Sequence, residues 1–430
     1  MARQRKRRKF GLVKLALVGV LGLGIVLAAG AGALMLLGMP TYEVPRPKVT
    51  VEATPERVAR GKRLVSMLCR RCHLDGGSGK LQGRVLEEIP KSLGIVSAPN
   101  ITRDPTVGIG EWSAAEVAVL LRTGLNSKTG ALVPPPVMPR WPGLADEDLL
   151  SILAFLESDD PWVAPSSEEP EPTRYSLRAK FRAITRWDPL SYPRTAIKMP
   201  DPSRLEVYGA YLVDQVLQCT ECHGQTWGTI DHANPKETAG YLAGGAATND
   251  VNDVVLRAAN LTPHETGLGS WTSEELGRAL VDGFGPDGKI VRWPMQRYPA
   301  LDSGDIEAIY TYLQNLAPVD KEIEPSPPYR MIGRKADGGV HLYTLYGCQY
   351  CHGQSGVGVA DLRDAATRLP TDEELIAYLE DPAREDPLTL MPSWKGVIPP
   401  EDYPELVEFI RRLGQKKKDA DDRKKAAKGK

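Results

Sequence analysis

The chain has 430 residues, of which 25% are charged and 42% hydrophobic, and its formal net charge is −1. At about 150 residues per domain, this length predicts roughly three domains. The ordinary apolar content excludes a wholly disordered chain. All six cysteines fall in three Cys-x-x-Cys pairs, and a histidine follows each pair at once, which argues against a disulfide framework.

The charge is distributed unevenly along the chain. Residues 1–14 carry +7 and residues 416–430 carry +5, which leaves −13 for residues 15–415. A nucleic-acid-binding protein needs a basic folded body, so this acidic body excludes nucleic acid as the expected partner.

The N-terminal region resembles a membrane entry segment. Residues 15–39 form a run of 25 residues without a charge, directly after the basic residues 1–14. About 20 apolar residues cross a bilayer as a helix, although the small residues at 28–33 leave a cleaved signal as an alternative. We therefore expect a cytoplasmic basic segment at 1–14, a transmembrane anchor at 15–39, and all later residues on the periplasmic face of the inner (cytoplasmic) membrane.

Three segments then repeat one order of features. Each begins with a helical stretch that leads into the cysteine pair, at 61–69, 209–219 and 339–348. Each continues with a Ser/Thr-x-x-Glu capping box that opens an amphipathic helix, at 113–116, 272–275 and 371–374. A proline-flanked methionine follows, and a last amphipathic helix closes each unit, at about 146–157, 303–316 and 401–413. A repeat of this kind predicts three copies of one folding unit.

These features define the expected organisation. We predict an all-α chain of three tandem domains behind the N-terminal helix: domain 1 at 50–160, a linker at 161–203, domain 2 at 204–318, a linker at 319–335, domain 3 at 336–415, and a disordered basic tail at 416–430. Units 1 and 2 also share an Asn-x-Thr and Gly-x-Gly-x-Trp stretch, at 100–112 and 260–271, which unit 3 lacks.

The Cys-x-x-Cys-His motif has a specific chemistry. Two thiols three positions apart on a helical turn can each add to a vinyl group of one haem, and the adjacent histidine then ligates its iron. Zinc is the weaker alternative, because it needs four ligands close together and these single pairs are more than 120 residues apart. We therefore expect three covalently bound c-type haems, attached at Cys69, Cys72, Cys219, Cys222, Cys348 and Cys351, with His73, His223 and His352 as proximal iron ligands.

The proline-flanked methionines are the expected distal ligands. Met138, Met295 and Met391 occupy the same place in the three repeats. A thioether opposite the histidine fills the sixth coordination position of the iron and raises its reduction potential. Core filling is the alternative role for any single methionine. Met199 has similar flanks but precedes unit 2, and the histidines outside the motifs are expected to be solvated or hydrogen-bonded. The pair Arg70-Arg71 predicts a higher potential for haem 1 than for haem 2.

With these residues in place, the chain resembles a class I cytochrome c repeated three times. It is similar, more narrowly, to the membrane-bound tri-haem cytochrome c subunits of bacterial alcohol, gluconate and aldehyde dehydrogenases. That resemblance implies an electron carrier of the respiratory chain rather than an enzyme. Its implied partners are the membrane, through the N-terminal helix, and redox proteins: a dehydrogenase subunit, a quinol-oxidising complex, a soluble cytochrome or an oxidase. A multihaem enzyme of peroxidase type, with one open haem site, is the alternative.

Overall fold

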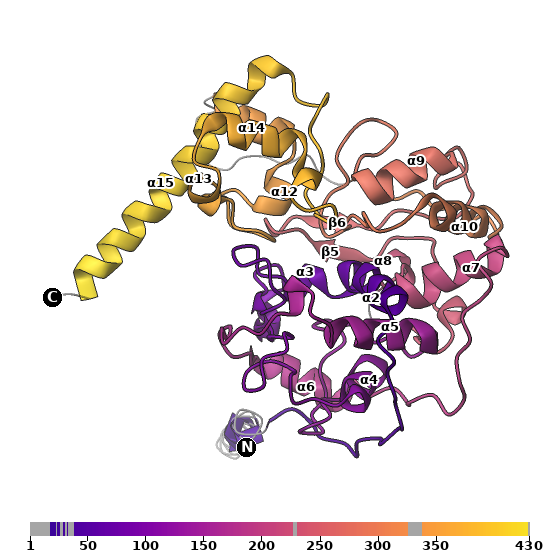
Figure 1. The fold of residues 1–430 in the computed structure, drawn as a ribbon. Helices are drawn as coiled ribbons and strands as arrows, with labels where there is room; N and C mark the ends of the chain where they lie inside the picture. Colours follow the sequence, from indigo (N-terminus) through magenta and orange to yellow (C-terminus); the bar gives the residue numbers. More distant parts are fainter. Residues whose placement is uncertain are drawn as a thin grey trace, which may run out of the picture.

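The computed structural model describes residues 38–226, 230–325 and 338–428, together with 18–22, 24–25, 29–30 and 32 near the N-terminus. Three helical units follow one another along the chain (Figure 1). Units 1 and 2 lie side by side, and unit 3 forms a separate lobe from which the last helix extends.

Unit 1 contains three longer helices connected by loops with short strands. Its elements are α2 (Pro55–Leu68), α3 (Arg70–His73), β1 (Arg84–Val85), η1 (Lys91–Leu93), β2 (Gly94–Ile95), β3 (Ser97–Ala98), α4 (Ala114–Thr123) and α5 (Asp146–Leu156). The following connector adds η2 (Pro161–Val163), β4 (Arg174–Tyr175) and α6 (Leu177–Thr185). Because β4 pairs with β2, this connector packs on unit 1.

Unit 2 repeats this order with two π-helical turns. Its elements are α7 (Leu205–Tyr211), η3 (Leu212–Val216), α8 (Thr220–His223), η4 (Pro235–Glu237), β5 (Ala247–Asn249), β6 (Val255–Arg257), α9 (Ser273–Gly277), η5 (Arg278–Asp282) and α10 (Ser303–Gln314). The π-helical turns are η3 and η5. The π-helical turn η3 and the left-handed residue Gln218 (φ 52°) both lie between Gly209 and Cys219, an interval two residues longer than its counterpart in unit 1.

Unit 3 is shorter between its motif and its closing helix. Its elements are α11 (Gly338–Leu345), α12 (Gln349–His352), η6 (Leu362–Asp364), α13 (Ala365–Arg368), α14 (Asp372–Glu380), η7 (Pro382–Arg384), η8 (Pro400–Asp402) and α15 (Tyr403–Lys428). All three predicted capping boxes are confirmed at the starts of α4, α9 and α14, where each N-cap hydroxyl accepts from the N3 backbone N–H.

The first and last helices of every unit cross at a glycine. A Cβ added at Gly61 or Gly209 would lie 1.9 Å from a backbone carbonyl oxygen of the closing helix, and one added at Gly339 would lie 2.6 Å from such an oxygen. The partner at each crossing includes an aromatic residue: Phe155, Tyr312 or Phe409. Only glycine permits this close approach, so the glycine at the start of each repeat fixes how its two long helices pack.

The apolar cores divide the molecule unequally. Units 1 and 2 share one continuous cluster that runs from Leu64 and Phe155 to Tyr312. Unit 3 has its own cluster around Tyr343 and Phe409, to which unit 2 adds Phe284. Three similar repeats therefore form two main hydrophobic cores rather than three, beside two smaller clusters around Val96 and Leu132 in unit 1.

The predicted fold class is wrong in two respects. The chain is not all-α, because three two-stranded antiparallel sheets form from β1 and β3, β2 and β4, and β5 and β6. These strands have only two or three residues, too few to leave an alternating pattern in the sequence.

The predicted transmembrane anchor is the second error. Among the residues that the structure describes, no helix is both long and apolar enough to cross a membrane. A span needs about 20 consecutive apolar residues. The described residues within 15–39 are only 18–22, 24–25, 29–30, 32, 38 and 39, and the rest of that prediction lies outside the described residues.

The C-terminal tail also differs from expectation. Helix α15 continues to Lys428, so the segment predicted as a disordered tail is helical over most of its length. Residues 415–428 contain neither glycine nor proline and are rich in lysine and alanine, which favour helix.

Candidate haem attachment sites

The three Cys-x-x-Cys-His motifs adopt the same local structure. Each occupies a four-residue helix, α3, α8 or α12, whose N-cap is the first cysteine. The carbonyl of that cysteine accepts from the histidine N–H in every unit, at 3.0, 2.8 and 2.9 Å. A single helical turn therefore holds two thiols and an imidazole in a fixed order, as the covalent attachment of one haem requires.

Each motif histidine is oriented by a backbone carbonyl. The Nδ1 atoms of His73, His223 and His352 lie 2.8, 2.8 and 3.0 Å from carbonyl oxygens of Pro99, Ala259 and Ala360, respectively. A carbonyl oxygen can only accept, so Nδ1 carries the proton and Nε2 keeps its lone pair. The second ring nitrogen is thus the one available to an iron, and the hydrogen bond fixes the plane of the ring.

Burial keeps these imidazoles neutral. Desolvation lowers the pKa of His73 to about 4, although the hydrogen bond to Pro99 opposes the shift. Desolvation also lowers the pKa values of His223 and His352. A neutral imidazole is the form that ligates a metal.

The repeated Asn-x-Thr stretch explains how the carbonyl is held in units 1 and 2. Asn100 directly follows Pro99, and its Oδ1 accepts from the N–H and the hydroxyl of Thr102 at 2.8 and 2.7 Å. Asn260 follows Ala259 and binds the N–H and hydroxyl of Thr262 in the same way, at 3.0 and 2.8 Å. The sequence repeat had drawn attention to these residues, but not to their role in orienting the histidine.

In unit 3 a shorter loop supplies the backbone carbonyl that orients the motif histidine. Ala360 lies only eight residues after His352, and the next residue, Asp361, accepts from the Arg363 N–H at 2.9 Å. A shorter loop brings the carbonyl to the imidazole without the buried Asn-x-Thr turn, which accounts for the stretch that this unit lacks.

All six cysteines are free thiols in the structure. Burial raises the pKa values of Cys69, Cys219, Cys222, Cys348 and Cys351 to about 12. In the parts of the chain that the structure describes, no three His, Cys, Asp or Glu side chains gather as a metal cluster. The zinc alternative requires such a cluster, whereas thioether attachment to a haem does not.

The three methionines predicted as distal ligands occupy equivalent loops before the closing helices. Met138, Met295 and Met391 are half-buried and pack against the cores of their own units. An aromatic residue stands three positions after each: Trp141, Tyr298 or Trp394. Iron ligation by these methionines stays a prediction.

Met199 is placed differently from these three. A guanidinium nitrogen of Arg60 lies 2.9 Å from its sulfur, so that sulfur already has a polar partner within the protein. This contact agrees with the expectation that Met199 has no part in a haem site.

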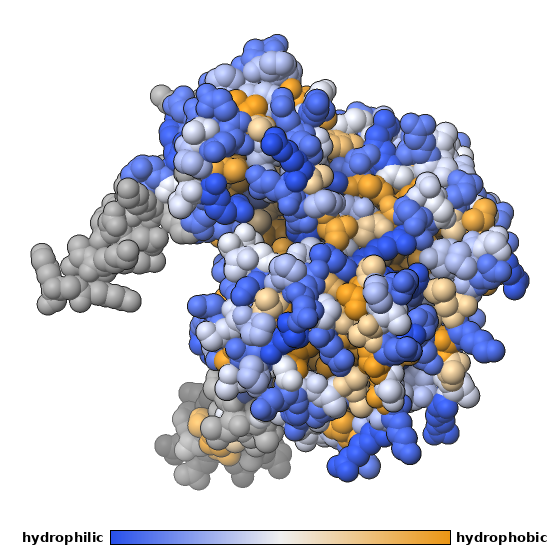
Figure 2. Space-filling view, viewed as in Figure 1, coloured by the Kyte–Doolittle hydropathy of each residue, from blue (hydrophilic) through white to orange (hydrophobic). Residues whose placement is uncertain are grey.

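The residues around the motifs fit a haem. The indole Nε1 of Trp394 is buried and has no hydrogen-bond partner among the described residues, so an acceptor on a bound group could satisfy it. Apolar residues are visible over the middle of the molecule, where the units meet (Figure 2). When bound, haem would supply a one-electron redox centre, and the cysteines and histidine of a motif would hold it.

Of the histidines outside the motifs, one lies close to a motif. The Nδ1 of His232 is 3.6 Å from a carboxylate oxygen of Glu221, which lies between Cys219 and Cys222. Burial lowers the pKa of His232 to about 4. His264 instead contacts the Thr266 hydroxyl at 3.0 Å, in the hydrogen-bonded role expected of it.

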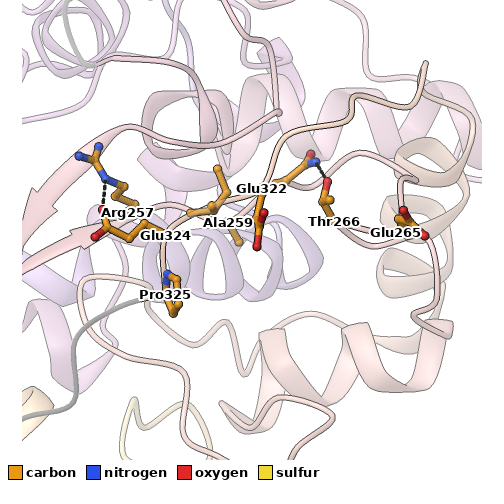
Figure 3. A pocket seen from close by; sticks show the side chains of 9 residues that line it. Arg257, Ala259, Glu265, Thr266, Glu322, Glu324 and Pro325 are labelled. Carbon is orange, nitrogen blue, oxygen red and sulfur yellow. Dashed lines mark hydrogen bonds and ion pairs between the residues drawn. The ribbon is translucent and has the colours of Figure 1, made fainter.

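A separate hollow of about 480 Å³ lies outside the haem motifs (Figure 3). Its lining includes Ala259 and Thr266, the carboxylates of Glu322 and Glu324, and Arg257, which pairs with Glu324 at 3.6 Å. It contains none of the motif cysteines, histidines or predicted methionine ligands. The hollow therefore borders the loop that orients His223 but is not the attachment site.

Comparison with known proteins gives two levels of similarity. Residues 56–156 and 334–410 match the family described as cytochrome C oxidase, cbb3-type, subunit III. The chain is 27% identical to the fructose dehydrogenase cytochrome subunit of Gluconobacter japonicus, over 76% of this chain and 70% of that protein. It is 26% identical to the alcohol dehydrogenase (quinone) cytochrome c subunit of Gluconobacter oxydans strain 621H, over 76% and 72% of the two chains.

A further relative is named as a dihaem protein. The chain is 26% identical to a diheme cytochrome c-type protein of Cereibacter sphaeroides, over 70% of this chain and 98% of that protein. The names of the dehydrogenase relatives are those of cytochrome subunits, in agreement with the prediction of an electron carrier rather than a catalytic subunit. The two stretches that match this family each contain one Cys-x-x-Cys-His motif with the histidine geometry described above, as covalent attachment of a c-type haem requires.

Proposed function

We propose that the chain is a tri-haem cytochrome c that carries electrons from a dehydrogenase or a quinol-linked donor to a downstream carrier or terminal oxidase. The observation that carries this proposal is the threefold recurrence of one geometry: a Cys-x-x-Cys-His helix whose histidine Nδ1 is bound to a carbonyl. Each copy leaves one imidazole nitrogen for iron, and each unit offers a methionine as the opposite ligand.

The charge of the folded body supports an electron carrier that docks by electrostatic attraction. Residues 15–415 carry −13, and each haem would add two propionates. A surface of this sign favours encounter with basic redox partners, and the association should weaken as salt is added. The similarity to cytochrome subunits of dehydrogenases makes such an enzyme the donor that we propose.

We further propose that the haem domains lie on the periplasmic side. The support comes from the order of a basic segment at 1–14 and an uncharged run at 15–39, which is typical of exported chains. A fusion of alkaline phosphatase after residue 415 should be active in cells if the domains are exported. An inactive fusion that accumulates in the cytoplasm would contradict this location.

The test of haem number and ligation uses the full chain expressed with a haem-attachment system. We expect three covalent haems by mass, a low-spin ferric spectrum, and a thioether-to-iron charge-transfer band. Replacing Met138, Met295 or Met391 singly with Ala should remove about one third of that band, because each variant removes the thioether ligand of one haem iron. Met199→Ala is the matched control and should leave the band unchanged, since its sulfur contacts Arg60.

Three outcomes would each contradict part of the proposal. A haem content below three would refute the tri-haem assignment. A native high-spin fraction that binds carbon monoxide or peroxide would instead favour an enzyme with an open site. An unchanged band in one methionine variant would refute that residue as a ligand.

A further inference from the structure

The two residues between the cysteines of the first motif face the other two units. Arg70 pairs with Asp386 of unit 3, five residues before Met391. Arg71 instead lies against unit 2, where its guanidinium carbon is 4.9 Å from the centre of the Trp293 ring. Trp293 is only 4% exposed and precedes Met295 by two residues. One attachment motif thus touches the methionine loops of both neighbours.

Units 1 and 2 exchange these contacts reciprocally. The Gln296 side chain beside Met295 donates to the carbonyl of Met67, two residues before Cys69, at 3.1 Å. In the opposite direction, the Gln218 side chain beside Cys219 donates to the carbonyl of Arg140, two residues after Met138, at 2.6 Å. Each unit therefore places its methionine loop on the attachment motif of the other, in an approximate two-fold arrangement.

A second pair of contacts between units 1 and 2 shows the same reciprocal pattern. The Arg63 side chain of α2 pairs with Asp305 in α10. Tyr211, which occupies the place of Arg63 in unit 2, donates to Asp148 in α5 at 2.5 Å. The reciprocity thus extends along the helices and brings the two attachment motifs together at the centre of the interface.

Arg71 is one of two arginines at this centre, because both Arg71 and Arg140 lie within electrostatic range of Glu221, between Cys219 and Cys222. The Arg71 side chain alone also lies within such range of Cys72 as well as Cys222, and of Glu88. Its backbone carbonyl accepts from Arg84 at 2.9 Å, which fixes the residue in the motif. The neighbouring cation, Arg70, is directed away to Asp386, and that carboxylate offsets its charge.

We propose that Arg71 is a positioning residue shared by two redox sites: its charge raises the reduction potentials of the haems attached at Cys72 and at Cys222 together. This inference rests on the proposed function. Ferric haem carries one more positive charge than ferrous haem, so the half-buried Arg71 cation favours the reduced state of every haem within its range. The structure thereby revises the expectation that the arginine pair distinguishes haem 1 from haem 2.

The test is a spectroelectrochemical titration of the full haem-loaded chain. Arg71→Gln should lower two of the three midpoint potentials and leave the third unchanged. We expect about a tenfold change in each reduction equilibrium, which is about 59 mV for a one-electron couple. The methionine variants described above assign each potential to its unit, because loss of a thioether ligand lowers the potential of its own haem.

Three further variants make the result decisive. Arg70→Gln removes one charge from the same motif and should leave the potential of the Cys222 haem unchanged. Arg71→Lys keeps the charge without the planar guanidinium and should restore both potentials. Arg71→Met loses the charge but keeps an apolar stem against Trp293, and it replaces Arg71→Gln if that variant fails to load three haems.

The outcomes separate this inference from the proposed function. A wild-type chain without three haems would refute the proposed function itself. Three haems together with a shift confined to the Cys72 haem, or with no shift, would refute the shared role of Arg71 and leave the proposed function intact.

Discussion

Units 1 and 2 differ from unit 3 in how they meet their neighbours, although all three repeat the same motif, cap and helix crossing. Units 1 and 2 merge their apolar cores and exchange equivalent hydrogen bonds. Unit 3 keeps its own core and joins the others through polar contacts, such as Asn252 to the Gln349 carbonyl at 3.0 Å, and through the Phe284–Trp394 ring pair at 5.6 Å.

This difference shows that a sequence repeat does not by itself define a unit of stability. A shared core couples the unfolding of two repeats, because neither can lose its packing without exposing apolar surface of the other. Unit 3 takes little of its core from a neighbour, chiefly Phe284, so it can open largely by itself. We therefore expect two thermal transitions in the haem-loaded chain, the larger for units 1 and 2 together.

The largest effect should come from the glycine crossings. Gly209→Ala forces a Cβ against the Ala308 carbonyl, which no side-chain movement can relieve, so we expect a loss of about 3 kcal/mol in stability, the upper end for overpacking. Calorimetry should show that the joint transition of units 1 and 2 falls in temperature while that of unit 3 stays. Gly339→Ala should do the reverse.

Gly304→Ala provides the control for this substitution. It lies in the first turn of the same closing helix, and its Cβ would meet only an Asp302 side-chain oxygen, at 3.3 Å. We expect a change in stability far smaller than that of Gly209→Ala, because the contact is with a side-chain atom and not with the backbone. Independent melting of unit 1 in Gly209→Ala would show that the shared core does not couple the two units.

The next largest effect concerns the Asn-x-Thr loop, which is present in both unit 1 and unit 2 and absent from unit 3. Asn260→Ala leaves the buried N–H and hydroxyl of Thr262 without their acceptor, which costs about 1–3 kcal/mol. Because Asn260 follows Ala259, the variant should also disturb His223, and magnetic circular dichroism should report this at one haem. The exposed Asn234→Ala is the control; equal effects of the two variants would exclude a role for the loop.

A smaller loss of stability should follow removal of one hydrogen bond between units 1 and 2. The Tyr211 hydroxyl donates to Asp148 and accepts from the Ala145 N–H at 3.0 Å, so Tyr211→Phe should cost about 1–2 kcal/mol in the joint transition. Tyr346→Phe removes a comparable hydroxyl bond, to Asp402 at 2.5 Å within unit 3. Its loss should appear only in the unit 3 transition of a calorimetric scan. A loss of stability from Tyr211→Phe in the unit 3 transition, or from Tyr346→Phe in the joint transition, would contradict the division into two unfolding units.

The smallest loss of stability should come from removing the N-cap hydroxyls, and it should be the same in every unit. Ser113→Ala, Thr272→Ala and Thr371→Ala each remove an N-cap hydroxyl, at about 1 kcal/mol apiece. Each loss should appear in the transition to which its unit belongs when unfolding is followed by circular dichroism. Ser273→Ala, next to one cap, removes only an exposed hydroxyl bond to Glu307 and serves as the control. Markedly unequal losses would mean that the units also differ in their own helices.

The sequence alone determined the elements whose causes are local. The attachment motif and the capping boxes depend on residues within a few positions, so their spacing is visible along the chain. The glycine that begins each repeat was visible as part of the repeat, but the helix crossing that requires it is a tertiary contact. The closing helices were also predicted to within two residues at 146–157 and 303–316, because their apolar periodicity is strong.

Only the tertiary structure decided how these elements combine. The connector around Tyr175 packs on unit 1 through its pairing with Gly94, whereas its sequence allowed either neighbour. The carbonyls that orient the three histidines carry no side-chain signature, and the short strands are too brief to show a period. The merging of units 1 and 2, with Arg71 between their motifs, depends on contacts between residues from 63 to more than 200 positions apart along the chain. Such contacts are set by the shapes of two folded surfaces, which no local pattern encodes.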